Sequence, residues 1–157
     1  YYFGEERKSR RLARDIVHNR KLTPFATSDD LLASMERSLG TRLEPQDKAR
    51  IFQALRIAVN NELEVLERAL PALRDRLEPN GVLVILSYHS LEDRRVKDAF
   101  REWSKSCICP PQVLVCQCRG VPLGKSLTKK PVRPSDDELE ANSRSRSALL
   151  RAWRKAA

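Results

Sequence analysis

The feature that most constrains the fold is the run "VLVILS" at residues 82–87, which changes within one residue into the polar stretch "YHSLEDRR". A continuous apolar run rich in β-branched residues is typical of a strand buried on both faces of a parallel sheet. The turn "EPNG" precedes this strand, and helical sequences lie on both sides of it. The order of helix, turn, buried strand and helix predicts an α/β fold with an open sheet, in which 82–87 is an interior parallel strand.

The first part of the chain is predicted to be helical. Residues 4–20 fit a helix with an acidic first turn and a basic remainder, which suits the helix dipole. A second, short helix begins after an N-cap at Thr27 or Ser28 and ends at Gly40. The polar stretch that follows contains a proline and predicts a domain boundary near residue 46.

A longer helical pattern occupies residues 48–77, where leucine, isoleucine and valine recur every three or four positions. Pro71 is expected to break or kink this helix. The last third of the chain contains prolines and glycines and has no helical period. There we expect strands at 126–132 and 147–153, which can pair antiparallel at the edge of the sheet, and a short helix around 135–142 between them.

The charge of the chain favours polyanionic partners. There are 30 basic and 21 acidic side chains, which give a formal net charge of +9. A field of this sign attracts nucleic acid or an anionic membrane surface, although a solvated basic face explains the charge equally well. No run of about 18 apolar residues occurs and no signal peptide precedes the first helix, so we expect a cytoplasmic protein. The chain begins at Tyr1 rather than at methionine, and we expect it to be part of a longer polypeptide.

The polar residues after the 82–87 strand are the first candidates for a functional site. In open α/β sheets, ligands bind in the crevice outside the carboxyl ends of the strands, and His89, Ser90, Asp93 and Arg94 fall there. Capping of the following helix by His89 or Ser90, with acidic residues in its first turn, is a complete structural explanation for Ser90 and Asp93. His89 and Arg94 are harder to explain by capping and are the better functional candidates.

A second polar stripe lies on the 48–77 helix. Arg50, Gln53, Arg56 and Asn60 are spaced by three and four residues, so they share one helix face. Such a stripe is usually solvated. Two arginines together with a glutamine and an asparagine could instead hold a phosphate or brace a neighbouring loop.

Four cysteines form two C-x-C pairs, Cys107 with Cys109 and Cys116 with Cys118, separated by six residues. Four thiolates can bind zinc tetrahedrally, but paired zinc ligands usually have two to four residues between them, so one is tight. A disulfide is disfavoured in a chain without a secretion signal. The sequence favours a reduced hairpin tip over zinc, and zinc over a disulfide.

A dense basic region covers the last third of the chain. Arg144, Arg146, Arg151 and Arg154 lie in and around the last predicted strand. Sequence-independent contact with phosphates is the function that such a region serves best, and an ordinary solvated surface is the alternative. The same region also contains Lys125, Lys129, Lys130 and Arg133.

Four stretches, taken in order, resemble one family: "GEERKSRRLARDIV", "RIFQALRIAVNNEL", "GVLVILSYHSLEDRRVK" and "TKKPVRPSDDELEANSRSRSALLRA". They are similar to the second half of the bacterial 16S rRNA (cytosine-N(4))-methyltransferases, the MraW/RsmH family, and the similarity runs almost from end to end. "FQALRIAVN" and "HSLEDR" make it far more specific than a single glycine motif. Tyr88 stands where the family usually has phenylalanine, and Ser143 where it usually has proline.

The resemblance implies the C-terminal half of a Rossmann-like, class I S-adenosylmethionine-dependent methyltransferase fold. Residues 1–46 would be the end of an inserted helical domain for substrate recognition, and residues 47–157 the C-terminal half of the methyltransferase domain. In this family the glycine-rich loop for S-adenosylmethionine comes earlier in the polypeptide, and this chain has no G-x-G pattern. The resemblance therefore implies that a missing N-terminal half binds most of the cofactor and that this part alone is inactive.

The implied activity is methylation of the N4 amine of a cytidine in 16S rRNA, near the decoding site, without a metal. The implied partner is the small ribosomal subunit, no membrane is involved, and the oligomeric state stays open, with a homodimer as one option. The residues expected to line the target side of the crevice are His89, Ser90, Asp93 and Arg94. Those expected to be structural are Arg50, Gln53, Arg56 and Asn60. Those expected to contact RNA are Arg7, Arg10, Arg11, Arg14, Lys129, Lys130, Arg144 and Arg146.

An alternative from a different class is a non-catalytic basic module that binds RNA or a ribosomal surface, with a zinc hairpin at the four cysteines as one version of it. The same basic residues would serve this function. A glycine-rich strand and loop upstream of Tyr1 would decide for the enzyme, and metal analysis would test the zinc hairpin.

Overall fold

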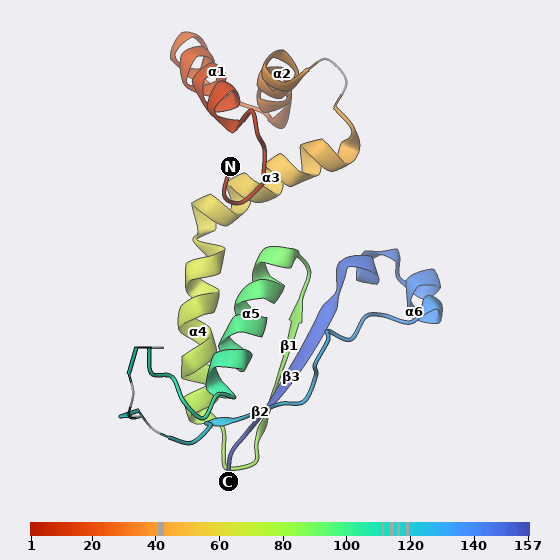
Figure 1. The fold of residues 1–157 in the computed structure, drawn as a ribbon. Helices are drawn as coiled ribbons and strands as arrows, with labels where there is room; N and C mark the ends of the chain where they lie inside the picture. The colour runs from red at the N-terminus through yellow and green to blue at the C-terminus, as the bar shows by residue number, and fades with distance from the viewer. Residues whose placement is uncertain (41–42, 111, 114, 116, 119) are drawn as a thin grey trace. The chain divides into compact units, whose positions relative to one another are not determined.

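The computed structural model describes residues 1–40, 43–110, 112–113, 115, 117–118 and 120–157. They fall into two units, Tyr1–Glu62 and Leu63–Ala157. The first unit is helical, and the second combines helices with a small sheet (Figure 1). The chain is therefore of mixed α/β composition, as predicted. None of the described helices is long and apolar enough to cross a membrane.

The first unit is built around a small apolar cluster. Its helices are α1 (Ser9–Leu22), α2 (Ser28–Leu39) and α3 (Pro45–Asn60). Leu12, Met35 and Ile51 contribute one buried side chain from each helix. α1 begins five residues later than the sequence pattern suggested, because residues 4–8 form turns and irregular structure rather than a regular helix. Pro45 is the first residue of α3, a position where its missing N–H leaves no helical hydrogen bond unmade.

The N-terminus of α2 forms as predicted. Thr27 is its N-cap residue, and the carboxylate of Asp30 accepts hydrogen bonds from the backbone N–H groups of Ala26 and Thr27, both at 2.8 Å. The helix ends at Gly40, whose φ of 139° lies in the region that favours glycine. Local sequence therefore determines both ends of this helix.

The break in the long helical pattern does not lie where the sequence indicated. Pro71 was expected to break or kink it, but the helix ends instead at Asn61, which adopts a left-handed conformation with φ of 51°. Asparagine tolerates this conformation better than most residues do. The second helix, α4 (Glu62–Arg76), continues through Pro71. Proline removes only one helical hydrogen bond there, and the burial of the adjacent Leu70 holds the helix against the core.

The second unit contains a three-stranded sheet in the order β1-β3-β2. Its strands are β1 (Val82–Ser87), β2 (Gly124–Ser126) and β3 (Leu149–Lys155). β3 confirms the strand predicted at 147–153, and it pairs antiparallel with β2, as predicted, but it is the central strand of the sheet rather than an edge strand. The strand predicted at 126–132 is only partly present, because β2 ends at Ser126 and Val132 forms an isolated bridge with Leu150. The short helix α6 (Asp136–Ala141) and the 3₁₀ helix η1 (Ser143–Ser147) complete the connection.

Pairing of β1 differs from the prediction. Within the described residues, its neighbour is β3, and the two strands run antiparallel with Leu83 opposite Trp153. The strand is also not buried on both faces, since Val82, Val84 and Leu86 are 40%, 53% and 50% exposed. The expectation of an interior parallel strand is therefore wrong for the sheet that this chain forms by itself. Successive side chains of a strand point to opposite faces, and helices cover only one of the two.

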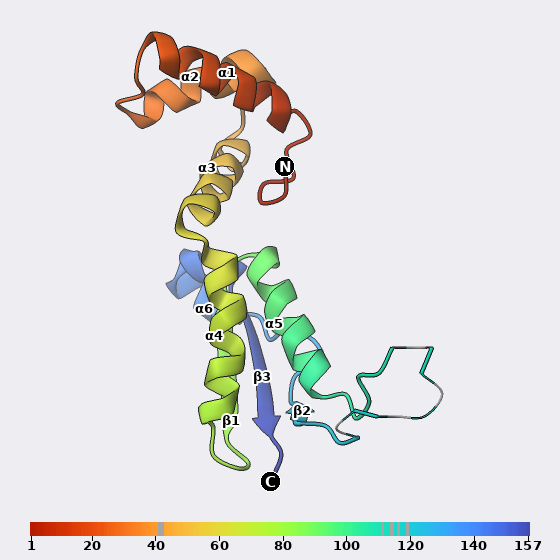
Figure 2. The same ribbon diagram turned by 90° about the vertical axis from the view of Figure 1, so that its left-hand side faces the viewer.

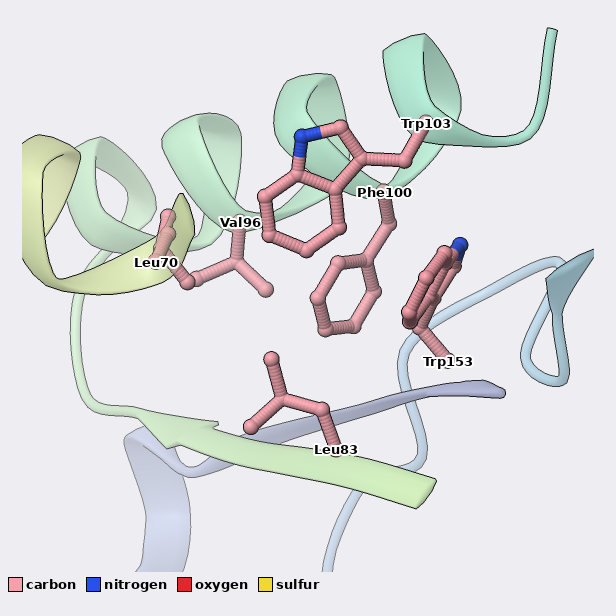
Figure 3. Close-up of a cluster of buried hydrophobic side chains, with 6 residues drawn as sticks. All are labelled: Leu70, Leu83, Val96, Phe100, Trp103 and Trp153. Carbon is pink, nitrogen blue, oxygen red and sulfur yellow. The ribbon is translucent and has the colours of Figure 1, made fainter. Parts of the chain in front are cut away.

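The covered face carries the core of the second unit. α4 and α5 (Ser90–Trp103) lie on the same side of the sheet (Figures 1 and 2). Six buried side chains from these helices and from β1 and β3 meet there, as Figure 3 shows: Leu70, Leu83, Val96, Phe100, Trp103 and Trp153. The rings of Trp103 and Trp153 contact each other edge to face, with centroids 5.2 Å apart. This aromatic packing fixes α5, and with it the polar residues of its first turn, relative to β1.

Candidate functional site

The candidate site lies at the carboxyl end of β1, where the strand turns into α5. Ser87 is buried, and its hydroxyl donates a hydrogen bond to the carbonyl oxygen of Leu149 at 3.2 Å. The backbone N–H of Tyr88 donates to a carboxylate oxygen of Glu92 at 3.0 Å. The end of the strand is thus anchored on both sides, and the following residues are held in fixed positions.

His89 is the N-cap residue of α5, one of the two residues that the sequence offered for this role. Its Nδ1 atom accepts a hydrogen bond from the backbone N–H of Glu92 at 3.3 Å. In the neutral ring Nε2 must then carry the proton, and this atom lies 3.3 Å from a carboxylate oxygen of Glu92. The side chain is only 11% exposed. Capping therefore explains the position of the ring and leaves Nε2 as its donor atom.

Asp93 is held by an arginine that the sequence did not pair with it. Arg151 donates two hydrogen bonds to the carboxylate of Asp93, from Nε at 2.6 Å and from Nη2 at 2.9 Å. The two side chains are only 7% and 14% exposed. Arg151 lies on the helix-covered face of β3 because it shares that face with Trp153, two residues further on. A bidentate pair in this setting binds α5 to the sheet.

Ser90 and Arg94 are the two predicted site residues that remain available to a ligand. Both are exposed, and Ser90 is the first residue of α5. Neither makes a side-chain hydrogen bond or ion pair in the described part of the chain. Arg95, next to Arg94, is occupied by an ion pair with Glu67 at 2.9 Å. The roles predicted for Ser90 and Arg94, at the target side of a crevice, stay predictions.

A groove of about 250 Å³ opens beside this end of β1, on the face of the sheet that α4 and α5 do not cover. Leu86 and Tyr88 form one wall, and η1 with the segment around Arg133 forms the other. Its lining residues are Leu86, Tyr88, Val132, Arg133, Pro134, Glu138, Asn142, Ser145, Ala148 and Leu150. The structure therefore brings a mixed apolar and polar groove together with the first turn of α5.

Basic residues of the second unit surround this region. Arg144 and Arg146 are exposed on η1, whose Ser145 lines the groove, and Lys129 and Lys130 are exposed in the segment after β2. The sequence analysis missed a further set, which lies along α5. Lys97, Arg101 and Lys105 line a second hollow of about 510 Å³ together with Lys129 and Arg151. Their spacing of four residues in "VKDAFREWSK" was the signal that could have found them.

The stripe on α3 supports its own unit. Arg50 forms ion pairs with Glu6 at 3.0 Å and Asp47 at 3.2 Å. Arg56 and Asn60 both donate to the carboxylate of Glu62, at 2.8 Å and 3.1 Å, and so brace the turn at Asn61. Gln53 is half-buried on the same helix. The geometry agrees with a bracing function more than with a phosphate site.

The basic residues predicted to contact RNA from the first unit lie in and before α1. Arg7, Arg10, Arg11 and Arg14 are all exposed. On the same helix, burial of Asp15 raises its pKa, but hydrogen bonds, above all from Arg37 at 3.1 Å, outweigh burial and lower the pKa overall. The carboxylate therefore stays ionised and holds α1 against α2, while the arginines stay accessible.

Three of the four cysteines fall within the described residues, and their sulfur atoms converge. The Sγ atoms of Cys107, Cys109 and Cys118 all lie within 4.8 Å of one another. Cys116, the fourth member of the predicted cluster, lies outside the described residues. From the spacing of the cysteines alone, a zinc site was one of three alternatives, beside a reduced hairpin tip and a disulfide.

Comparison with known proteins identifies the family to which the chain belongs. Residues 1–156 match the MraW methylase family, and the chain belongs to this family, which confirms the resemblance. It is 59% identical over 98% of its length to "Ribosomal RNA small subunit methyltransferase H" of Gemmatimonas aurantiaca, covering 49% of that protein. Proteins of the same name from Syntrophobacter fumaroxidans and Heliobacterium modesticaldum are each 47% identical, over 99% and 98% of the chain. The chain spans about half the length of these relatives.

Proposed function

We propose that this chain is the C-terminal half of a methyltransferase that transfers a methyl group from S-adenosylmethionine to the N4 amine of a cytidine in small-subunit rRNA, near the decoding site, in the cytoplasm. The observation that carries this proposal is the 59% identity, over almost the whole chain, with a relative named as a small-subunit rRNA methyltransferase. The net charge of +9 supports a polyanionic substrate. The full-length protein would be about twice as long as this chain.

The open face of the sheet supports the proposal that further strands belong beside β1. β1 pairs only with β3 among the described residues, and its residues Val82, Val84 and Leu86 are exposed on the face that α4 and α5 leave open. A free strand edge next to an apolar surface is unfavourable in water. In the full-length protein, strands from the other half would continue the sheet at this edge as a Rossmann-like fold, and their helices would cover this face.

The described residues of this chain do not by themselves fit a site for S-adenosylmethionine. A nucleotide-binding glycine loop connects a strand to the helix that follows it. Here Gly81 lies in the turn before β1, and Gly124 lies in β2, where an added Cβ would overlap the carbonyl oxygen of Arg154 and the ring of Trp153. Both glycines therefore serve the backbone of this sheet, and we assign cofactor binding mainly to the other half.

The contribution of this chain would be to position the target. A base inside an rRNA helix must leave its stack to reach an enzyme pocket, and its exocyclic amine must be held in line with the donor group. The exposed guanidinium of Arg94 would bind the flipped nucleotide at the carboxyl end of β1. The Nε2 atom of His89 is buried and faces Glu92, so it would reach the nucleotide only after a movement of Glu92 or of the ring. The arginines of η1 and α1 would contact phosphates of the surrounding RNA.

A charge reversal tests this assignment in the full-length protein. Arg94→Glu should lower methyl incorporation into unmethylated small subunits by about tenfold or more, the effect of one lost charge-assisted hydrogen bond. The free energy of unfolding should not change, because Arg94 is exposed and makes no described ion pair. Arg68→Glu is the matched control, since Arg68 is an exposed arginine in the middle of α4. If Arg94→Glu methylates as well as the control, Arg94 does not belong to the site.

The two functions of His89 can be separated by two substitutions. Asparagine is a good N-cap residue and alanine is a poor one, so His89→Ala should lose about 1 kcal/mol of stability and His89→Asn much less. If Nε2 also binds the target, methylation should fall in both variants. If His89→Asn keeps full methylation activity, and only the less stable His89→Ala loses activity, then His89 serves as a helix cap only.

A further inference from the structure

The connection between α5 and β2 contains a cluster of sulfur atoms that the proposed methyl transfer does not use. Cys107 and Cys109 lie on the first arm of this connection and Cys118 on the second, and their three Sγ atoms lie within 4.8 Å of one another. We propose that these cysteines bind one Zn²⁺ ion. The sequence offers Cys116 as the fourth thiolate, so that the complete site would be of the four-cysteine type.

The separations between the sulfur atoms suit a single ion. Zinc binds cysteine sulfur at about 2.3 Å, so the ligands of a tetrahedral site are on the order of 3.8 Å apart. Sulfur atoms within 4.8 Å of one another therefore need only small side-chain rotations to reach this geometry. The one-residue spacing that disfavoured zinc at the sequence level is no obstacle, since side chains two residues apart point to the same side of an extended backbone. Both Sγ atoms of the first pair thus face Cys118.

Hydrogen bonds already hold one sulfur atom against the other arm of the connection. The N–H of Ile108, the residue between the first two cysteines, donates to the Sγ atom of Cys118 at 3.3 Å. The Sγ atom of Cys118 also lies 4.0 Å from the carbonyl oxygen of Ser106, to which the thiol donates. Both partners belong to the first arm, so the backbone orients Cys118 toward Cys107 and Cys109, as hydrogen bonds to metal ligands do.

The described residues of this connection form no apolar core that could hold its arms together. Its base is closed by a hydrogen bond from the N–H of Leu123 to the carbonyl oxygen of Trp103, at 2.8 Å. Beyond the base, Ile108, Val115 and Val121 are exposed, at 43%, 72% and 61%. No helix or strand forms among the described residues of 105–123. A loop of this length needs another source of order, and a metal that joins its two arms supplies one.

The same geometry argues against the two competing states of these cysteines. A disulfide would use two sulfur atoms and leave the third beside it without a function. A reduced hairpin tip does not require sulfur atoms from two arms of the connection to lie at one point. Three sulfurs from two arms at one point are what a metal site requires.

Metal content tests the proposal independently of any methyl transfer. The 157-residue chain, purified with a reducing agent and without chelator, should contain about one zinc per chain by elemental analysis. Cys107→Ser, Cys109→Ser and Cys118→Ser should each lower zinc content or affinity by about tenfold or more. Ser106→Ala changes a side chain in the same loop and keeps all four thiols, so it should retain the zinc. Replacement by Co²⁺ should give the visible absorption of a tetrahedral thiolate site.

Every other outcome contradicts the proposal. A chain without metal in which all four thiols react with a thiol reagent has a reduced hairpin tip. A mass lower by two hydrogens indicates a disulfide, and stoichiometric iron indicates a cluster instead of zinc. Far-UV circular dichroism should show that the cysteine variants are folded like the unchanged chain, because α5 and the sheet have their own core. A loss of zinc then reflects the lost ligand and not unfolding. A failure here would leave the proposed methyltransferase function untouched.

Discussion

At the level of single residues, the pair formed by Asp93 and Arg151 shows how strongly tertiary contacts decide the function of a side chain. Asp93 was a candidate for the target side of the crevice, yet its carboxylate is held by two hydrogen bonds from a buried arginine 58 positions away. Arg151 was grouped with the basic region of the last third of the chain, for which contact with phosphates was the favoured function. The structure turns it toward α5 instead, on the covered face of the sheet.

Removal of one partner of this pair should be strongly destabilising. Asp93→Ala leaves the guanidinium of Arg151 buried without its counter-charge, which costs on the order of 3–5 kcal/mol. Urea denaturation of the second unit followed by tryptophan fluorescence would measure this, since Trp153 lies two residues from Arg151 in β3. The double variant Asp93→Leu with Arg151→Met should recover much of the loss, because no unpaired charge remains. Equal stability of Asp93→Ala and the exposed control Ser90→Ala would show that the pair contributes nothing.

At the level of elements, the ends of α2 illustrate structure that local sequence controls. The carboxylate of Asp30 accepts hydrogen bonds from the backbone N–H groups of Thr27 and Ala26 and from the Thr27 hydroxyl, and these bonds lower the pKa of Asp30 below its ordinary value. All the partners lie within four residues. Between α3 and α4, Asn61 adopts the left-handed conformation, and the ion pair from Arg56 to Glu62 spans this turn.

The lowered pKa gives the cap of α2 a definite pH dependence. The folded state favours the ionised carboxylate, so the contribution of the cap is complete above the ordinary aspartate pKa of about 3.9 and is lost as the pH falls through the lower folded value. An NMR titration of the Asp30 side-chain carbon should therefore give a midpoint below the ordinary range. Thr27→Ala removes the hydroxyl donor and should move the midpoint upward. A midpoint at or above the ordinary value would contradict the hydrogen bonds described.

At the level of the whole molecule, the sheet ends in an apolar face and a free edge within the described residues. Val82, Val84 and Leu86 belong to this face, and the groove beside Tyr88 opens on the same side. The relatives that contain this sequence are about twice as long. The proposed interface with a further half of the polypeptide would account for both observations.

Hydrogen exchange tests this interface. The backbone amides of β1 should exchange more slowly in the full-length protein than in the 157-residue chain, because added strands would occupy its free edge. β3 is the internal control, since it already has β1 on one side and β2 on the other and should be equally protected in both proteins. Equal protection of β1 in the two proteins would mean that the sheet does not continue at this edge.

The sequence by itself determined the features that depend on neighbouring residues or on a whole family pattern. The N-cap of α2, its end at Gly40, the strand at 82–87 and the helix at 135–142 follow from interactions within a few positions, which a local pattern records. Family membership followed from motifs spread along the chain.

Only the tertiary structure decided the contacts between distant residues. It paired Asp93 with Arg151, brought Cys118 to the first two cysteines, and gave β1 an antiparallel neighbour with one open face. None of these leaves a periodic signal, because each depends on which faces two separate elements turn toward each other. The apolar run in β1 predicted burial on both faces, and the described residues of this chain bury only one of them.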